Sequence, residues 1–201
     1  MSGKPARRQR GVTLIELIVF IVILGIALAG VLQMLNLATR LGVDPVRRKQ
    51  ALLIAEGLME EVQLAHFTWC DPLDPRAEEA ASPADCSIPE QLGPEAGNAR
   101  PFDNVNDYVT QLDTPTPAFD NAAGRLVDAN GDNFGPPGYT ALLTVSADNR
   151  LGPAGAQIAS GSAPAAMNVL RLSVSVRYGT AAADLVVLDG YRSRYAPRSV
   201  P

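Results

Sequence analysis

The chain has 201 residues, of which 47% are hydrophobic, and a formal net charge of −4. No basic patch follows the N-terminal region, and this argues against nucleic acid as the main partner. Two cysteines and one histidine are too few for a Cys/His zinc site, and the length beyond the N-terminal region suffices for one soluble domain of ordinary size.

The N-terminal region combines a basic start with a long apolar run. Residues 17–35 carry no charge, and as a helix they would be about 28 Å long, close to the hydrocarbon thickness of a bilayer. Glu16 stands at the N-terminal edge of this run, where a carboxylate near a membrane costs free energy and therefore indicates a partner. The basic residues that precede the run are Lys4, Arg7, Arg8 and Arg10.

Two ordinary interpretations compete for this run. A secretory signal peptide has a shorter apolar core and a small-residue cleavage site of the Ala-x-Ala type, and neither is present here. A plain signal anchor explains the apolar run and the basic start, but it does not explain Glu16.

The heptapeptide Gly11-Val12-Thr13-Leu14-Ile15-Glu16-Leu17 resembles the processing motif of type IV prepilins and of the related type II secretion pseudopilins. The resemblance implies cleavage by prepilin peptidase between Gly11 and Val12 and N-methylation of the new terminus. It also implies a role in assembly for Glu16, the fifth residue of the mature chain. The family usually has Phe in place of Val12, a departure that bears on methylation more than on cleavage.

Basic residues lie on both sides of the apolar run, so the positive-inside rule is nearly balanced by count. The charges of the leader come first and lie closer to the membrane. We therefore expect insertion in the inner membrane with a cytoplasmic N-terminus and a periplasmic C-terminal domain. The basic residues after the run are Arg40, Arg47, Arg48 and Lys49.

A second helical segment is expected after Gly42. Asp44-Pro45 predicts a restart or a kink, because Asp is a good N-cap and Pro a good first helical residue. Residues 46–66 have helical periodicity, which predicts an apolar face packed on a globular domain and a polar face in water. The apolar face comprises Leu52, Ala55, Leu58, Met59, Val62 and Ala65, and the polar face comprises Arg48, Lys49, Glu56, Glu60, Glu61 and Gln63.

The segment 67–101 is expected to be a long loop pinned by a disulfide between Cys70 and Cys86. The two cysteines are close in sequence, lie in polar surroundings and belong to a segment predicted to leave the cytoplasm. Closing a loop of this size contributes about 3 kcal/mol to stability. Two unrelated thiols are the alternative.

A short helical turn within 102–112, a loop over 113–138 and three strands complete the predicted elements. The strands are expected over 139–146, 169–178 and 185–195, with clear alternation of apolar and polar residues in the second. The short connection 179–183 predicts a hairpin. The fold class is therefore α+β: a long, partly transmembrane N-terminal helix packed on a small antiparallel sheet, which resembles the pilin architecture.

These elements divide the chain into a leader peptide (1–11), a transmembrane and assembly helix (12–41), an amphipathic helix extension (42–66) and a periplasmic domain (67–201). Within the pilin-like family, the residues 44–45, 48–56, 60–62, 70–72 and 102–105 resemble minor pilin D of the mannose-sensitive haemagglutinin (MSHA) pilus.

Two acidic stretches are candidate metal-binding sites. Asp128, Asn130 and Asp132 have the spacing of the first oxygens of a calcium loop, but Asn133 and Tyr139 stand where Gly and a bidentate Glu are needed. An Asn-Gly-Asp turn is the preferred interpretation. The cluster in 102–108 is expected to cap a helical turn. No metal or other cofactor is expected.

The sequence predicts a structural subunit and not an enzyme, since it has neither a Gly-x-Ser-x-Gly elbow nor a phosphate-binding glycine loop. The expected function is that of a minor pilin of a type IV pilus, with prepilin peptidase, other pilin subunits and the assembly machinery as partners. A type II secretion pseudopilin is the close alternative. A membrane-anchored periplasmic enzyme or binding module is the alternative from another class.

Overall fold

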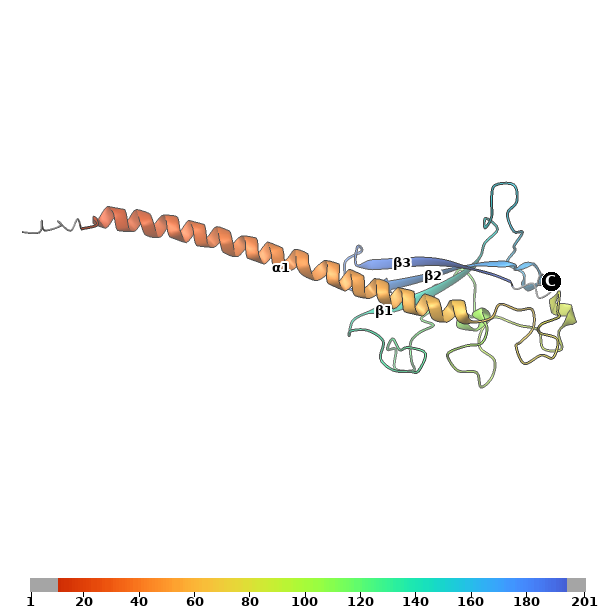
Figure 1. The fold of residues 1–201 in the computed structure, drawn as a ribbon. Helices are drawn as coiled ribbons and strands as arrows, with labels where there is room; N and C mark the ends of the chain where they lie inside the picture. Colours follow the sequence, from red (N-terminus) through yellow and green to blue (C-terminus); the bar gives the residue numbers. More distant parts are fainter. Residues whose placement is uncertain (1–10, 195–201) are drawn as a thin grey trace, which may run out of the picture. The chain divides into compact units, whose positions relative to one another are not determined.

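A computed structural model of the chain describes residues 11–194, except for the side chains of residues 37–44. The chain forms one long helix, α1 (Leu14–Leu64), followed by three strands, β1 (Thr140–Ala147), β2 (Val169–Arg177) and β3 (Leu185–Ser193) (Figure 1). It divides into two units at the bond between Val46 and Arg47. Three short 3-10 turns interrupt the loops: η1 (Pro83–Asp85), η2 (Val105–Tyr108) and η3 (Pro164–Ala166). The predicted leader charges Lys4, Arg7, Arg8 and Arg10 lie outside the described residues.

Helical backbone continues through Pro45, so of the two predicted alternatives at Asp44-Pro45, a restart or a kink, the restart is wrong. Proline lacks the N–H that would bond the carbonyl four residues earlier, but it fits the helical φ angle. α1 ends at Leu64, where the chain changes to extended backbone. There the N–H of His66 donates to the carbonyl of Asp103 (2.8 Å), and the N–H of Val105 donates to the carbonyl of His66 (2.9 Å).

The three strands form one antiparallel sheet in the order β1-β2-β3, which confirms the predicted sheet and the hairpin between β2 and β3. Leu143 pairs with Val174, and Val174 pairs with Leu188. The alternation in β2 is confirmed because its apolar residues are buried on one face of the sheet. β3 ends at Ser193, and the predicted strand residue 195 lies outside the described part of the chain.

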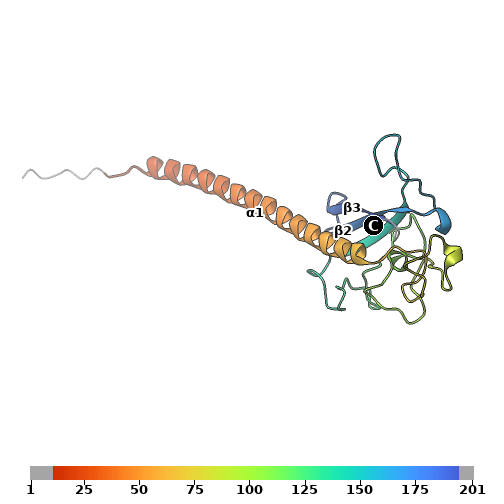
Figure 2. The same ribbon diagram turned by 45° about the vertical axis from the view of Figure 1, so that its right-hand side comes forward.

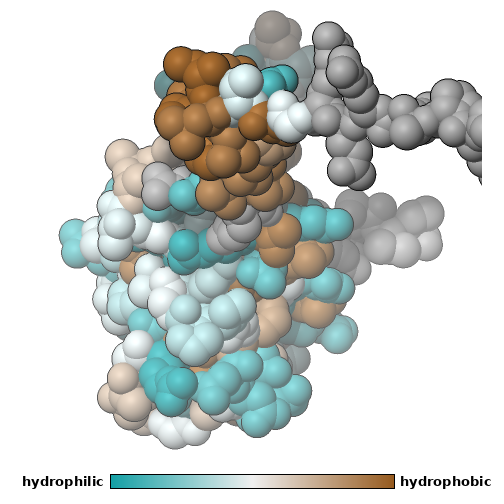
Figure 3. Space-filling view, turned by 90° about the vertical axis from the view of Figure 1, so that its left-hand side faces the viewer, coloured by the Kyte–Doolittle hydropathy of each residue, from teal (hydrophilic) through white to brown (hydrophobic). Residues whose placement is uncertain are grey.

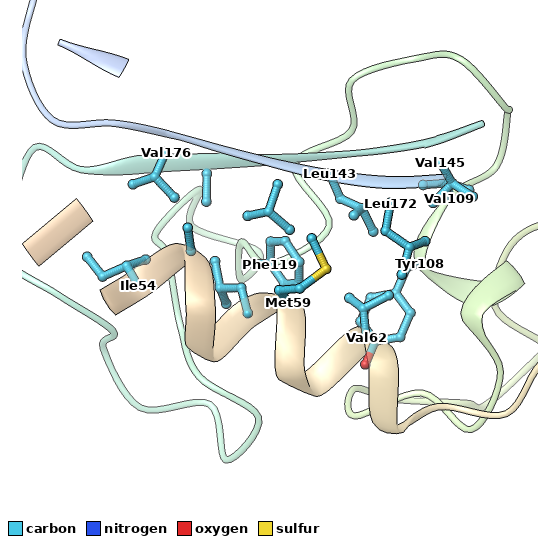
Figure 4. Close-up of a cluster of buried hydrophobic side chains, with 14 of the residues drawn as sticks. Ile54, Met59, Val62, Tyr108, Val109, Phe119, Leu143, Val145, Leu172 and Val176 are labelled. Atoms are coloured by element: carbon cyan, nitrogen blue, oxygen red, sulfur yellow. The ribbon is translucent and has the colours of Figure 1, made fainter. Parts of the chain in front are cut away.

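The core of the C-terminal unit lies between the last turns of α1 and the sheet. Figure 4 shows Met59 and Val62 of the helix on the side of Leu143 and Leu172 of the sheet, and Ile54 below Val176. Figures 1 and 2 both show the loops of 67–138 beside the C-terminal end of α1, and these loops contribute core residues as well. The loop contributions are Val105, Tyr108, Val109, Phe119 and Leu126.

The buried stripe of α1 is shifted from the predicted one by a residue at its start. Leu52 was predicted to face the domain, but it is 38% exposed, while Ala51 and Ile54 are 0% and 5% exposed. One residue turns a helix by about 100°, so a stripe that runs through Ala51 and Ala55 turns Leu52 away from the core. The rest of the predicted stripe is buried.

α1 lies close to β3 at Gly190. A Cβ at this position would lie 2.6 Å from Nε2 of Gln63 and 2.8 Å from the sulfur of Met59. A glycine within a strand often marks such a close approach of another element. Gly190 therefore lets the helix lie directly on the strand.

Candidate functional site

The residues that resemble a processing motif precede α1. Gly11, Val12 and Thr13 are exposed and non-helical, and α1 begins at Leu14. No atom lies within 4 Å of the position that a Cβ at Gly11 would occupy. The bond between Gly11 and Val12 is therefore not covered by any described residue and is open to a peptidase.

Thr13 caps the start of α1. Its carbonyl accepts from the N–H of Leu17 (3.1 Å), and its hydroxyl accepts from the N–H of Glu16 (3.4 Å). Glu16 lies in the first helical turn, where the helix dipole favours a negative charge. Its side chain is exposed and forms no ion pair with any side chain that the structure describes.

The first part of α1 is apolar on all sides. By length and composition the 23 residues Leu14–Asn36 could cross a membrane, and none of this window is buried. Apolar side chains cover this part of the helix, which faces the viewer in brown in Figure 3. Ile15, Phe20 and Met34 are 71%, 62% and 76% exposed. Such a surface needs lipid or a partner helix, because apolar area left in water costs about 25 cal/mol per Å².

The predicted disulfide between Cys70 and Cys86 is confirmed. Asp74 stabilises the loop that the disulfide closes. Its carboxylate accepts from the N–H groups of Arg76 (2.8 Å) and Ile88 (2.6 Å). These backbone hydrogen bonds, that of Arg76 first, lower the pKa of Asp74 below its ordinary value. Oδ2 of Asp85 likewise accepts from the N–H groups of Ala81 and Ser82, just before η1.

The candidate calcium residues lie in a tight turn. Oδ1 of Asp128 accepts from the N–H groups of Asn130 and Asp132, at 2.9 Å each. The N–H of Asp128 in turn donates to the carbonyl of Asp132 (2.8 Å). Asp128 therefore shapes its own turn, as the preferred interpretation of this stretch expected.

The helical turn predicted in 102–112 is η2, and the acidic cluster caps it as expected. Oδ1 of Asn104 accepts from the N–H of Asn106 (3.4 Å), and Oδ2 of Asp107 accepts from the N–H of Asn104 (3.1 Å). The sequence did not reveal that this turn brings Asp107 to two other carboxylates, Glu90 and Glu95. No local spacing signals this cluster, because irregular loops bring its members together.

Glu61 was placed on the water-facing side of the helix, and this prediction is wrong. Its side chain is only 10% exposed and binds Arg100, a residue of the loop that follows. The hydroxyl of Tyr108 also donates to Glu61. A buried partner for a charged helical residue cannot be deduced from helical periodicity alone.

Comparison with known proteins identifies the N-terminal segment. Residues 6–32 match the family described as the prokaryotic N-terminal methylation motif. The match includes the bond between Gly11 and Val12, and Glu16, and it extends into the apolar part of α1. It supports a type IV pilin-like or pseudopilin precursor that is processed by prepilin peptidase. Such a precursor is a structural subunit anchored in a membrane. Searches among curated proteins and among solved structures each found no match.

Proposed function

We propose that the chain is a minor pilin, a structural subunit of a type IV pilus. One observation carries this proposal: an exposed processing motif leads directly into an apolar helix long enough to cross a membrane. The four expected parts of the chain follow from it: leader 1–11, assembly helix 12–41, helix extension 42–66 and periplasmic domain 67–201.

The subunit first enters the inner membrane through the apolar part of α1. The C-terminal unit then lies in the periplasm, an oxidising compartment in which disulfides form and persist. The bond between Cys70 and Cys86 supports this orientation. Prepilin peptidase next cuts after Gly11, from the cytoplasmic side, and leaves Val12 as the first residue of the mature chain.

Assembly replaces lipid around the apolar helix with the helices of other subunits. Glu16 would then lie in a low-dielectric environment, where an unpaired carboxylate is costly and a paired one strongly attracts its partner. Val12 lies two residues before α1, and Glu16 lies in the first turn of that helix. A neighbouring subunit that is offset along the fibre can therefore bring its own N-terminal ammonium to Glu16 and set the axial register.

A pseudopilin of a type II secretion system is the second candidate, since the same motif and helix serve both machines. The loose likeness of 44–45, 48–56, 60–62, 70–72 and 102–105 to minor pilin D of the MSHA pilus favours the pilus. A subunit of a pilus is recovered in surface fibres removed by shearing. A pseudopilin instead remains with the cell, and its deletion abolishes secretion.

The mature N-terminus tests the proposal. Mass spectrometry of the protein isolated from membranes should find Val12 as the first residue, with or without a methyl group. A first residue of Met1 or Ser2 would remove both candidates and leave a plain membrane anchor that carries an enzyme or a binding module.

A further inference from the structure

Three carboxyl groups meet in the loop region of the C-terminal unit. Oxygen atoms of Glu90, Glu95 and Asp107, one from each residue, all lie within 4.8 Å of one another. Glu90 and Asp107 are 6% and 2% exposed. The backbone fixes the arrangement, because the N–H of Glu90 donates to the carbonyl of Trp69 (3.0 Å) and the N–H of Gly93 donates to that of Asn106 (3.0 Å).

In each of the two buried carboxyl groups, one oxygen accepts a hydrogen bond and the other has no hydrogen-bond partner. Oε1 of Glu90 accepts from the N–H of Gln91 (3.2 Å), and Oδ2 of Asp107 accepts from the N–H of Asn104 (3.1 Å). Oε2 of Glu90 and Oδ1 of Asp107 are buried without a hydrogen-bond partner. Buried acceptors left in this state cost free energy, which a bound cation or a bound proton would relieve.

Asn106 provides an independent observation. It is 6% exposed, and its amide oxygen is also buried without a partner. Asn106 and Glu90 line the same cavity of about 20 Å³. A space of this size holds one particle as small as a water molecule or a bare ion. Amide and carboxylate oxygens, such as those of Asn106 and Glu90, are both ligands that calcium accepts.

The cationic side chain that lines this cavity is already engaged by other groups. Arg194 lines the same cavity, but its guanidinium donates to the carbonyls of Met167 and Thr68 and lies 3.6 Å from the ring centre of Trp69. The two ion pairs found in residues 11–194 involve none of the three carboxylates.

We propose that Glu90, Glu95 and Asp107, together with the amide oxygen of Asn106, bind a calcium ion. Calcium–oxygen distances are about 2.3–2.6 Å, so two oxygens on opposite sides of the ion lie roughly 5 Å apart. The separation of at most 4.8 Å fits this limit. Magnesium binds at about 2.0–2.1 Å, demands nearly octahedral geometry and usually keeps several waters, whereas calcium accepts irregular sets of protein oxygens.

Calcium at this site would join the segment 90–95 to η2. The ion replaces protons that the buried carboxylates otherwise hold, so its affinity rises with pH. The site differs from the turn at Asp128, whose carboxylate is occupied by its own backbone. The inference does not depend on the proposed function, because it concerns a cluster that lies wholly within the C-terminal unit.

Terbium luminescence tests the site on the full chain in detergent micelles. The chain has a single tryptophan, Trp69, which lines the cavity together with Glu90. Excitation of Trp69 should therefore sensitise emission from Tb³⁺ bound at the cluster. We expect Ca²⁺ to displace this emission and an equal concentration of Mg²⁺ not to do so. Absence of emission that Ca²⁺ displaces would overturn the proposal.

Matched variants locate the ion. Glu90→Gln combined with Asp107→Asn should lower the Ca²⁺-displaceable emission at least about tenfold, since it removes two of the three charged ligands. Asp128→Asn should leave the emission unchanged. An unchanged signal in the double variant, or a loss in Asp128→Asn, would place the ion elsewhere and overturn the assignment.

A thermal measurement on the unmodified chain needs no variant. Calcium at 100 times its dissociation constant should raise the melting temperature by roughly 5–10 °C relative to EDTA. The double variant, whose neutral side chains no longer need a cation, should melt at the same temperature in calcium and in EDTA. A melting temperature of the unmodified chain that does not respond to millimolar calcium would overturn the proposal even if the variant failed to fold.

Discussion

Arg100 and Glu61 form a bidentate ion pair between a loop and the last part of α1. Nε of Arg100 lies 2.6 Å from Oε1 of Glu61, and Nη2 lies 2.8 Å from Oε2. Oε1 also accepts from the hydroxyl of Tyr108 (3.0 Å), and Nη1 of Arg100 donates to the carbonyl of Phe119 (3.0 Å). The pair therefore connects the helix to three separate loop positions.

We expect Arg100→Ala to lower the free energy of unfolding by about 3 kcal/mol, because it leaves the carboxylate of Glu61 buried without its cation. Denaturant unfolding measures this loss. The control is Arg171→Ala, which removes an ion pair with Asp189 whose side chains are 47% and 38% exposed. Exposed pairs of this kind contribute at most about 1 kcal/mol. Equal losses in the two variants would contradict a structural role of the buried pair.

Replacing Cys70 and Cys86 together with alanine should lower stability by about 3 kcal/mol, since the unfolded chain is no longer constrained by the loop. Denaturant unfolding with and without reductant measures the effect. Reductant should weaken the unmodified chain and leave the double variant unaffected. Alkylation of the native, non-reduced protein should label neither cysteine, and labelling of both would refute the bond.

Stability without calcium should fall as pH rises from about 4 to 8. Burial raises the pKa of Glu90 to about 8 and that of Asp107 to about 7, in both cases with help from nearby carboxylates that include Glu95. The folded chain therefore keeps protons that the unfolded chain releases over this range. Unfolding experiments in EDTA across the range measure the slope, and Glu90→Gln should reduce it.

Other groups act in the opposite direction but in another range. Hydrogen bonds from backbone N–H groups lower the pKa of Asp74 and of Asp85, so their contribution is lost only when pH falls below the ordinary range of carboxyl groups. Arg194 stays charged throughout, although burial lowers its pKa to about 10. Stability that rises steadily from about pH 5 to 8 in EDTA would show that Glu90 and Asp107 are not protonated in the folded chain.

Gly11→Leu should accumulate the precursor that retains its leader. A peptidase must bring backbone atoms close to the bond that it cuts, and glycine has no side chain to obstruct this approach. Gel mobility and mass spectrometry of membrane fractions distinguish the two forms. Gly25→Leu is a matched control in the apolar helix, where a Cβ meets no atom within 4 Å, and it should be processed normally. Normal processing of Gly11→Leu would disprove the assigned cleavage site.

Glu16→Ala should be inserted and cleaved after Gly11 but should enter fibres poorly. The variant lacks the carboxylate proposed to receive the ammonium of a neighbouring subunit. Immunoblots of sheared fibres, compared with whole cells, measure incorporation. Glu56→Ala, which removes an exposed carboxylate elsewhere on α1, serves as the control. Incorporation of Glu16→Ala at the level of the unmodified chain would mean that Glu16 merely remains in water.

The helix and the strands could be predicted from the sequence because the spacing of their apolar residues depends on neighbouring residues only. The alternation in β2 and the apolar run of α1 each follow from neighbouring residues alone. Leu52 shows the limit of such patterns, since an apolar residue next to a buried stripe satisfies the period almost as well as Ile54. The cluster of Glu90, Glu95 and Asp107 could not be predicted, because irregular loops without a period bring it together.

The cap at Thr13 gives proteolysis an electrostatic consequence. In the precursor, residue 12 is joined to Gly11 by a neutral peptide bond and carries no charge of its own. If the chain is cut after Gly11, a full positive charge appears one residue before the cap, at the end of the helix that least tolerates a cation. Cleavage would thus fix an ammonium group next to the positive end of the dipole, and a carboxylate from another chain would offset this charge. A covalent cut would in this way give each subunit a charge that favours association with a neighbour.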